Sequence, residues 1–130
     1  MPARTGLLQI GQVAERTGLS LRTIRFYEEN GLVRPTSRSD GGFRLYTQAD
    51  VDKILVIRRM KPLGFSLDQM KDVMADLATL GDPRADGPCR SAAQDRLGSI
   101  REEARERRTK LAQQLDMADE FIHLLGTRTP

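Results

Sequence analysis

The sequence predicts a mainly α-helical chain in which a helix-turn-helix and a β-hairpin wing precede one long helix. Three features carry this prediction. Two short amphipathic stretches meet at "TGLS", a tight turn that contains glycine. Two short apolar runs, "LVRP" and "FRLY", flank the turn-forming residues "RSDGG". Further on, hydrophobic residues recur every seven positions, which is typical of a coiled-coil helix.

The helix-turn-helix is expected from its capping residues. The first helix, over residues 9–18, ends at Gly18, because glycine readily adopts the left-handed conformation of a helix C-cap. Ser20 is placed to N-cap the second short helix. We expect Ile24 and Phe26 of that helix to lie in the core.

Two further helices are expected after the wing. Thr47 is placed as an N-cap, with Asp50 at the position of a capping box. Pro62 and Gly64 should end this third helix. Ser66 is placed to cap a fourth.

The chain divides into three predicted segments. Residues 8–77 form a domain, and residues 78–90 form a linker, since two glycines and two prolines fall within it. Residues 91–125 form the heptad helix, whose repeating positions are Leu97, Ala104, Leu111, Ala118 and Leu125. A helix this long at the end of a small domain predicts a second copy, hence a homodimer, and Arg107 and Gln114 on the seam would set its register.

The charge is unevenly distributed. Residues 1–61 carry 11 Lys and Arg against 6 Asp and Glu, a balance of +5. Residues 62–130 carry 10 against 12, a balance of −2, and the two balances sum to the net charge of +3. A basic front half suggests a polyanionic partner, although chance clustering would give the same balance.

The second helix carries residues suited to DNA. Arg22 and Arg25 lie one turn apart and point the same way. The planar fork of an arginine can bond O6 and N7 of one guanine. Thr23 and Tyr27 could bond phosphate through their hydroxyls. The alternative is a solvated arginine face.

The predicted wing is also basic. Arg38 and Arg44 flank its glycine-rich tip, which suits a DNA minor groove or adjacent phosphates. The alternative is that these charges only protect an edge strand from aggregation. Two basic surfaces on one helix-turn-helix favour DNA.

The stretch from Ile10 to Leu67 resembles the DNA-binding domain of the MerR family of bacterial transcription regulators. The pieces that carry the resemblance are "TIRFYE", "GLVRP", "GGFRLYT" and "LGFSL", in that order and without gaps. The remainder resembles the family only in its layout, a helical connector followed by a long helix.

The resemblance implies a homodimer, paired through an antiparallel coiled coil, that binds double-stranded promoter DNA. Such a dimer bends and untwists the promoter so that RNA polymerase contacts both promoter elements, which makes an effector-responsive activator the expected function. The resemblance further implies DNA contacts from Arg22, Arg25, Tyr27, Arg38, Phe43, Arg44 and Tyr46. The alternatives are an effector-independent architectural DNA-binding protein or a simple repressor.

The effector is the least constrained expectation. The chain ends five residues after Leu125, so no drug-binding domain is expected. The sequence contains no CxxC cluster, so an iron–sulfur centre is not expected either. In an antiparallel dimer, Cys89 of one chain lies near His123 of the other, which allows a sparse metal site with oxygen from Asp119 or Glu120. Cys89 could instead sense oxidants as a lone thiol, or be an ordinary linker residue. The cofactor is therefore left open by the sequence.

Several classes of protein are disfavoured. No run of 18 apolar residues occurs, so no membrane span is expected. One cysteine and no signal peptide favour the cytoplasm. One histidine, one cysteine and no identifiable carboxylate pair argue against an enzyme. A pure protein-interaction coiled coil would leave the paired arginines and basic wing unexplained.

Overall fold

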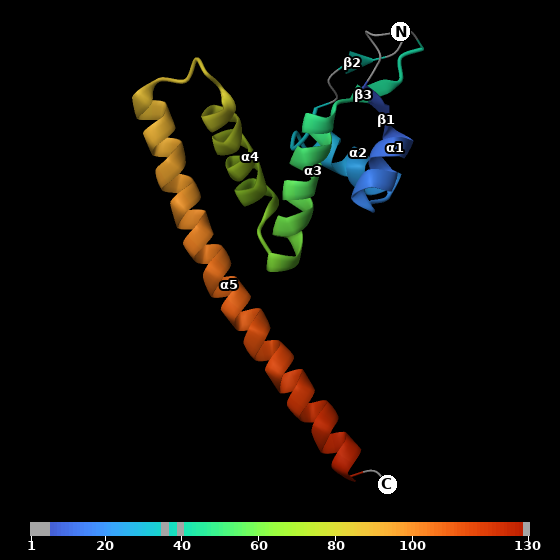
Figure 1. Ribbon diagram of the computed structural model, residues 1–130, viewed down its shortest axis with the longest axis vertical. Helices are drawn as coiled ribbons and strands as arrows, with labels where there is room; N and C mark the ends of the chain where they lie inside the picture. The colour runs from blue at the N-terminus through green and yellow to red at the C-terminus, as the bar shows by residue number, and fades with distance from the viewer. Residues whose placement is uncertain (1–5, 35–36, 39–40, 129–130) are drawn as a thin grey trace. The chain divides into compact units, whose positions relative to one another are not determined.

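The computed structural model describes residues 6–34, 37–38 and 41–128. The chain divides into two compact units, with the boundary between Ala75 and Asp76. Figure 1 labels the helices and strands of both units. Along the chain the elements are β1 (Leu8–Gln9), α1 (Ile10–Thr17), α2 (Leu21–Glu29), β2 (Ser37–Arg38), β3 (Arg44–Tyr46), α3 (Gln48–Met60), the 3₁₀ helix η2 (Lys61–Leu63), α4 (Leu67–Gly81) and α5 (Gly87–Arg128).

The helix-turn-helix is confirmed, together with its caps. Gly18 adopts the left-handed conformation, with φ 70°, and its N–H donates to the carbonyl of Ala14. The Ser20 hydroxyl accepts from the Thr23 N–H at 3.1 Å, which satisfies one free donor of α2. Arg58 of α3 donates to the carbonyl of Thr17, so α3 holds the turn in place.

The wing contains a hairpin, but its strands are shorter than expected. β2 and β3 pair antiparallel, with Arg38 opposite Arg44. The predicted strand "LVRP" is wrong for residues 32–34, which lie in no strand; Leu32 and Val33 are buried, so their apolar character reflects the core. Two residues of the predicted turn, 39 and 40, lie outside the described residues. A third strand, β1, pairs with the other side of β3.

The predicted starts of the next two helices are confirmed. Thr47 and Asp50 form a reciprocal capping box at α3, with bonds of 3.0 and 3.2 Å. α3 ends in η2, and Gly64 follows it with φ 81°. The Ser66 hydroxyl accepts from the Gln69 N–H at 3.1 Å, which caps α4.

The first unit has one apolar core. Helix α2 contributes Ile24 and Tyr27, which lie three residues apart on one face. Phe26 lies on the other side of α2 and is 48% exposed, so its predicted place in the core is wrong. The other large buried side chains include Val13, Leu32, Val33, Tyr46, Val51, Ile54, Ile57 and Phe65.

The second unit joins the end of α4 to α5 through residues 82–86 alone. The predicted linker, residues 78–90, is therefore too long: α4 continues to Gly81, and α5 begins at Gly87 rather than Ser91. Pro88 does not interrupt α5, because the first turn of a helix needs no N–H from that position. Asp86 caps this turn by accepting from the Cys89 N–H at 2.7 Å.

Two arginines fix the start of α5 against the end of α4. The Arg90 guanidinium donates to the carbonyls of Leu80, at 3.1 Å, and Ala85, at 3.2 Å. The Arg96 guanidinium forms a fork with the Asp76 carboxylate, at 2.8 to 3.1 Å. Asp76 is 6% exposed, so it depends on this partner.

We expect Arg96→Ala to lower the free energy of unfolding by about 1–3 kcal/mol, because it strands a largely buried carboxylate while Arg96 itself is partly solvated. Denaturant unfolding at one fixed protein concentration measures this. Arg101→Ala, an exposed arginine further along α5, is the matched control. An equal loss of unfolding free energy in both variants would show that the contact between Arg96 and Asp76 does not stabilise the fold.

Candidate nucleic-acid interface

The outer face of α2 carries two exposed arginines. Arg22 and Arg25 are both exposed and lie one turn apart, as predicted. Ser20 caps the helix directly before them, so the first turn is well fixed. Thr23 lies in the same turn, but its hydroxyl shares a hydrogen bond of 2.9 Å with the Ser20 hydroxyl. Thr23 therefore contributes to the cap, and its phosphate contact stays a prediction.

A carboxylate joins α2 to the wing. Glu28 Oε1 lies 2.7 Å from Arg44 Nε, and Glu28 Oε2 accepts from the Tyr46 hydroxyl at 2.9 Å. The Arg44 contact is an ion pair rather than an aligned hydrogen bond. The Glu28 side chain is 10% exposed, so its charge is largely desolvated and both contacts matter. Sequence reasoning missed Glu28, because nothing local shows that β3 lies beside this position.

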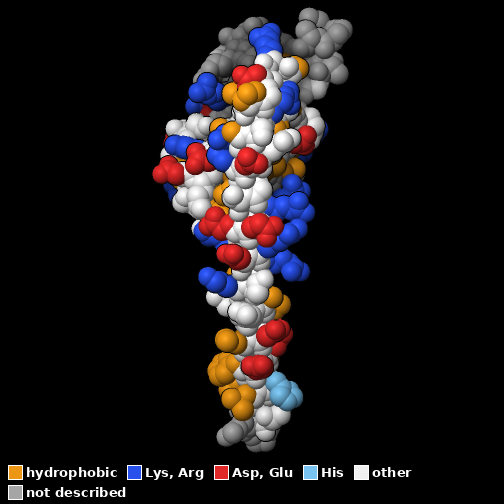
Figure 2. Space-filling view, turned by 90° about the vertical axis from the view of Figure 1, so that its left-hand side faces the viewer, with side chains coloured by type: hydrophobic (Ala, Val, Ile, Leu, Met, Phe, Trp, Pro, Cys, Tyr) orange, Lys and Arg blue, Asp and Glu red, His pale blue; other side chains and the backbone are white. Residues whose placement is uncertain are grey.

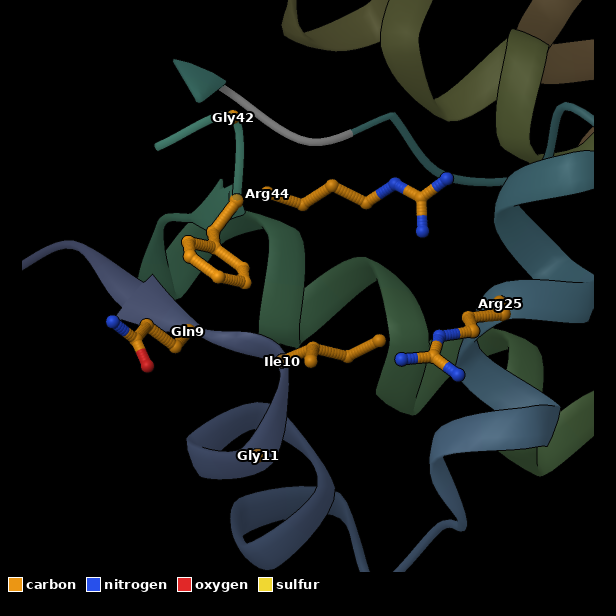
Figure 3. A pocket seen from close by; sticks show the side chains of 7 residues that line it. Gln9, Ile10, Gly11, Arg25, Gly42 and Arg44 are labelled. Carbon is orange, nitrogen blue, oxygen red and sulfur yellow. The ribbon is translucent and has the colours of Figure 1, made fainter. Parts of the chain in front are cut away.

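A cleft of about 250 Å³ opens between α2, the start of α1 and the wing. Figure 3 shows the side chains of Arg25 and Arg44 extending toward each other from opposite sides of it. The lining is completed by Gln9, Ile10, Gly11, Gly42 and Phe43. Arg25 and Arg44 are the charged side chains among these lining residues, so the cleft favours an anion.

The two predicted tyrosine contacts are corrected by the structure. Tyr27 is 2% exposed and Tyr46 is fully buried, so both are core residues. Burial, together with the hydrogen bond to Glu28, raises the pKa of the Tyr46 hydroxyl. Tyr27 lies on the face of α2 opposite Arg25, whereas Tyr46 shares with Arg44 the face of β3 that meets Glu28. Neither side chain is available to a phosphate in this conformation.

The other wing residues fall into two groups. Phe43 is 68% exposed at the rim of the cleft. The backbone of Arg38 lies in β2 opposite Arg44, whereas its side chain lies outside the described part of the chain. The DNA contacts predicted for Arg38 and Phe43 stay predictions.

The candidate effector residues lie far apart in one chain. Cys89 and His123 are both exposed on α5, and 34 positions of helix between them span about 51 Å. The charge and hydrogen bond of Asp86 raise the pKa of the Cys89 thiol. Across the residues that the structure describes, no three His, Cys, Asp or Glu side chains gather as metal ligands.

Known proteins resemble this chain in both sequence and fold. The family model of the MerR HTH regulatory proteins matches residues 8–77. The transcriptional regulator CueR of Vibrio cholerae is 41% identical over 110 residues, which cover 84% of this chain and 76% of the relative. A MerR family regulator from Listeria monocytogenes superimposes with a TM-score of 0.69 and 29% identity, over 93% of this chain and 91% of its own.

A further structure, the regulator HiNmlR, was determined with promoter DNA and is described as lacking the sensor domain. It has a TM-score of 0.70 over 92% of this chain and 88% of its own, and at 22% identity it shows the fold alone. The identity to CueR and the matched family model go further. They show that this chain belongs to the MerR family of helix-turn-helix regulatory proteins and is a DNA-binding transcription regulator.

Proposed function

We propose that the protein binds promoter DNA as a homodimer and regulates transcription by deforming that DNA. The observation that carries the proposal is the basic surface shared by α2 and the wing, in which Arg22, Arg25 and Arg44 lie on neighbouring elements. Helix α2 enters the major groove, as second helices of this motif do. We propose that the protein acts by binding DNA in the cytoplasm rather than by catalysing a reaction.

The two arginines of α2 have different surroundings, which supports different roles. Arg22 lies in the first turn, where side chains of a recognition helix meet base edges, so we assign it to guanine. Arg25 lines the cleft together with Arg44. Two cations on opposite sides of a small cleft suit a backbone phosphate, which fixes register rather than sequence.

A second copy of the chain is proposed to cover the end of α5. Its large hydrophobic side chains are exposed over residues 111–125, with Leu115 at 63%, Phe121 at 59% and Ile122 at 65%. Figure 2 shows hydrophobic side chains gathered toward that end of the helix. Apolar positions in a heptad pattern are buried by a partner helix. In an antiparallel pair, each protomer supplies one of the two helices.

Deformation of the promoter is the proposed means of activation, with RNA polymerase as the later partner. A dimer of fixed geometry holds its two DNA-binding units at a fixed spacing, so DNA that does not match must twist or bend. A simple repressor or an architectural protein would bind the same site. In vitro transcription separates them, because only an activator raises the transcript yield from a promoter whose elements are too far apart.

We do not propose that a thiolate at Cys89 senses the effector. The neighbouring carboxylate of Asp86 favours the protonated thiol, which is the less reactive form. A metal held by Cys89 and His123 of opposite protomers stays a prediction of the sequence. None of the described helices is both long enough and apolar enough to cross a membrane.

We expect Arg22→Ala to weaken binding to a selected operator by about 5- to 150-fold while affecting random DNA much less, since a bidentate base contact contributes about 1–3 kcal/mol of discrimination. Fluorescence anisotropy on both DNAs measures this. Arg25→Ala is the comparison: a phosphate contact should weaken binding to both DNAs alike and lower the salt slope by about one. Equal losses from Arg22→Ala on the two DNAs would refute its assignment to bases.

We expect Phe121→Asp to convert the dimer to monomer, because it places a charge in the apolar surface between helices. Sedimentation equilibrium measures the molar mass. Gln113→Asp adds the same charge at another exposed position of α5 and should leave the dimer intact. A wild-type chain that sediments as a monomer would contradict the proposed assembly.

We expect Asp86→Asn to speed the alkylation of Cys89 at neutral pH. Asparagine caps a helix as well as aspartate does, so α5 is preserved, while loss of the negative charge lowers the pKa of the thiol and increases the thiolate fraction. Iodoacetamide labelling followed by mass spectrometry over a pH series reports this. Asp116→Asn, further along α5, should change nothing. An unchanged profile in Asp86→Asn would show that Asp86 does not control the thiol.

A further inference from the structure

Exposed hydrophobic side chains in the first unit are confined to its proposed DNA-binding elements. Of the described residues before Asp76, the large hydrophobic side chains that are exposed are Leu21 at 40%, Phe26 at 48% and Phe43 at 68%. Two lie on α2 and the third lies on the wing. Single exposed hydrophobic residues are ordinary, but their confinement to the two elements proposed to bind DNA indicates that these elements meet a partner.

Leu21 is the exposed hydrophobic residue that lies next to the proposed base-contacting arginine. It is the first residue of α2, directly after the Ser20 cap and directly before Arg22. Its exposure is not forced by a lack of core, because Ile24 and Tyr27 of the same helix are almost fully buried. An exposed leucine at this place therefore adds an apolar contact beside the proposed guanine-reading arginine.

We propose that Leu21 determines sequence specificity by contacting the C5-methyl group of a thymine next to the guanine bound by Arg22. The inference rests on the proposed mode of DNA binding. A leucine side chain has no hydrogen-bonding atom, so it cannot read the donors and acceptors of base edges. In the major groove the thymine methyl is the apolar feature that distinguishes one base from the others.

Phe26 supplies the matched control. It lies on the same helix with a similar exposed fraction, and it follows Leu21 by more than one turn. Residues at the start of a recognition helix contact base edges, while later turns diverge toward the walls of the groove. Phe26 is thus assigned to the sugar-phosphate wall, where contact does not depend on a base methyl.

The test replaces thymine by deoxyuridine, which removes only the methyl group. Operators are first selected from random duplexes with the full chain. Each thymine of the selected half-site is then replaced, and affinity is measured by anisotropy for wild type, Leu21→Ala and Phe26→Ala. At one position wild type should lose about fourfold, the effect of one buried methyl group. Leu21→Ala should lose this sensitivity at that position, and Phe26→Ala should keep it.

The outcomes separate this inference from the function on which it rests. If selection yields no preferred duplex, the proposed function fails, and the inference fails with it. If an operator is bound but no thymine is sensitive to the replacement, or the sensitivity persists in Leu21→Ala, only the assignment to Leu21 is overturned. Thermal unfolding of both variants controls for folding, and little change is expected since both side chains are about half exposed.

Discussion

The carboxylate of Glu28 is the constraint on which the proposed DNA-binding surface depends. It lies on α2, yet both of its partners, Arg44 and Tyr46, lie on β3. A carboxylate that is 10% exposed is costly without a cation and a donor, so displacing the wing from α2 would leave it desolvated and unpaired. The contact thus sets the distance between the arginines of α2 and those of the wing.

The same contact explains the division of labour among the wing residues. Tyr46 is committed to the core through its ring and to Glu28 through its hydroxyl. Arg44 uses Nε for the ion pair, and its side chain remains 36% exposed at the cleft. One strand thereby anchors the wing with a buried residue and presents a cation two positions earlier on the same face, because side chains two positions apart on a strand point the same way.

Local signals in the sequence predicted most of the helical fold. The caps at Ser20, Thr47 and Ser66 act over three residues, so a short stretch contains both partners of each bond. The length of the linker was overestimated because the prediction relied on local signals alone. Glycine and proline indicate turns, but Pro88 is compatible with the first turn of α5.

Features that depend on distant partners were predicted less well. β1 has two residues, too few for an alternating pattern, and it exists because β3 provides hydrogen bonds to it. Phe26 and Tyr27 are adjacent aromatic residues, and only the direction of the core decides which one is buried. The contact of Glu28 with β3 likewise spans 16 to 18 residues of sequence.

The two ends of α5 differ in their contacts, since the start is held by polar contacts and the far end exposes hydrophobic side chains. Its start is held by Arg90 and Arg96, through carbonyls that end α4 and through the Asp76 carboxylate. Arg107, predicted on the seam, pairs with Glu103 of its own helix at 2.7 Å. Beyond it the hydrophobic side chains are exposed. Because hydrophobic contact is non-directional, the apolar end is the part of α5 proposed to bind a second copy, while the arginine contacts at the start hold the first turns of α5 against the last turn of α4.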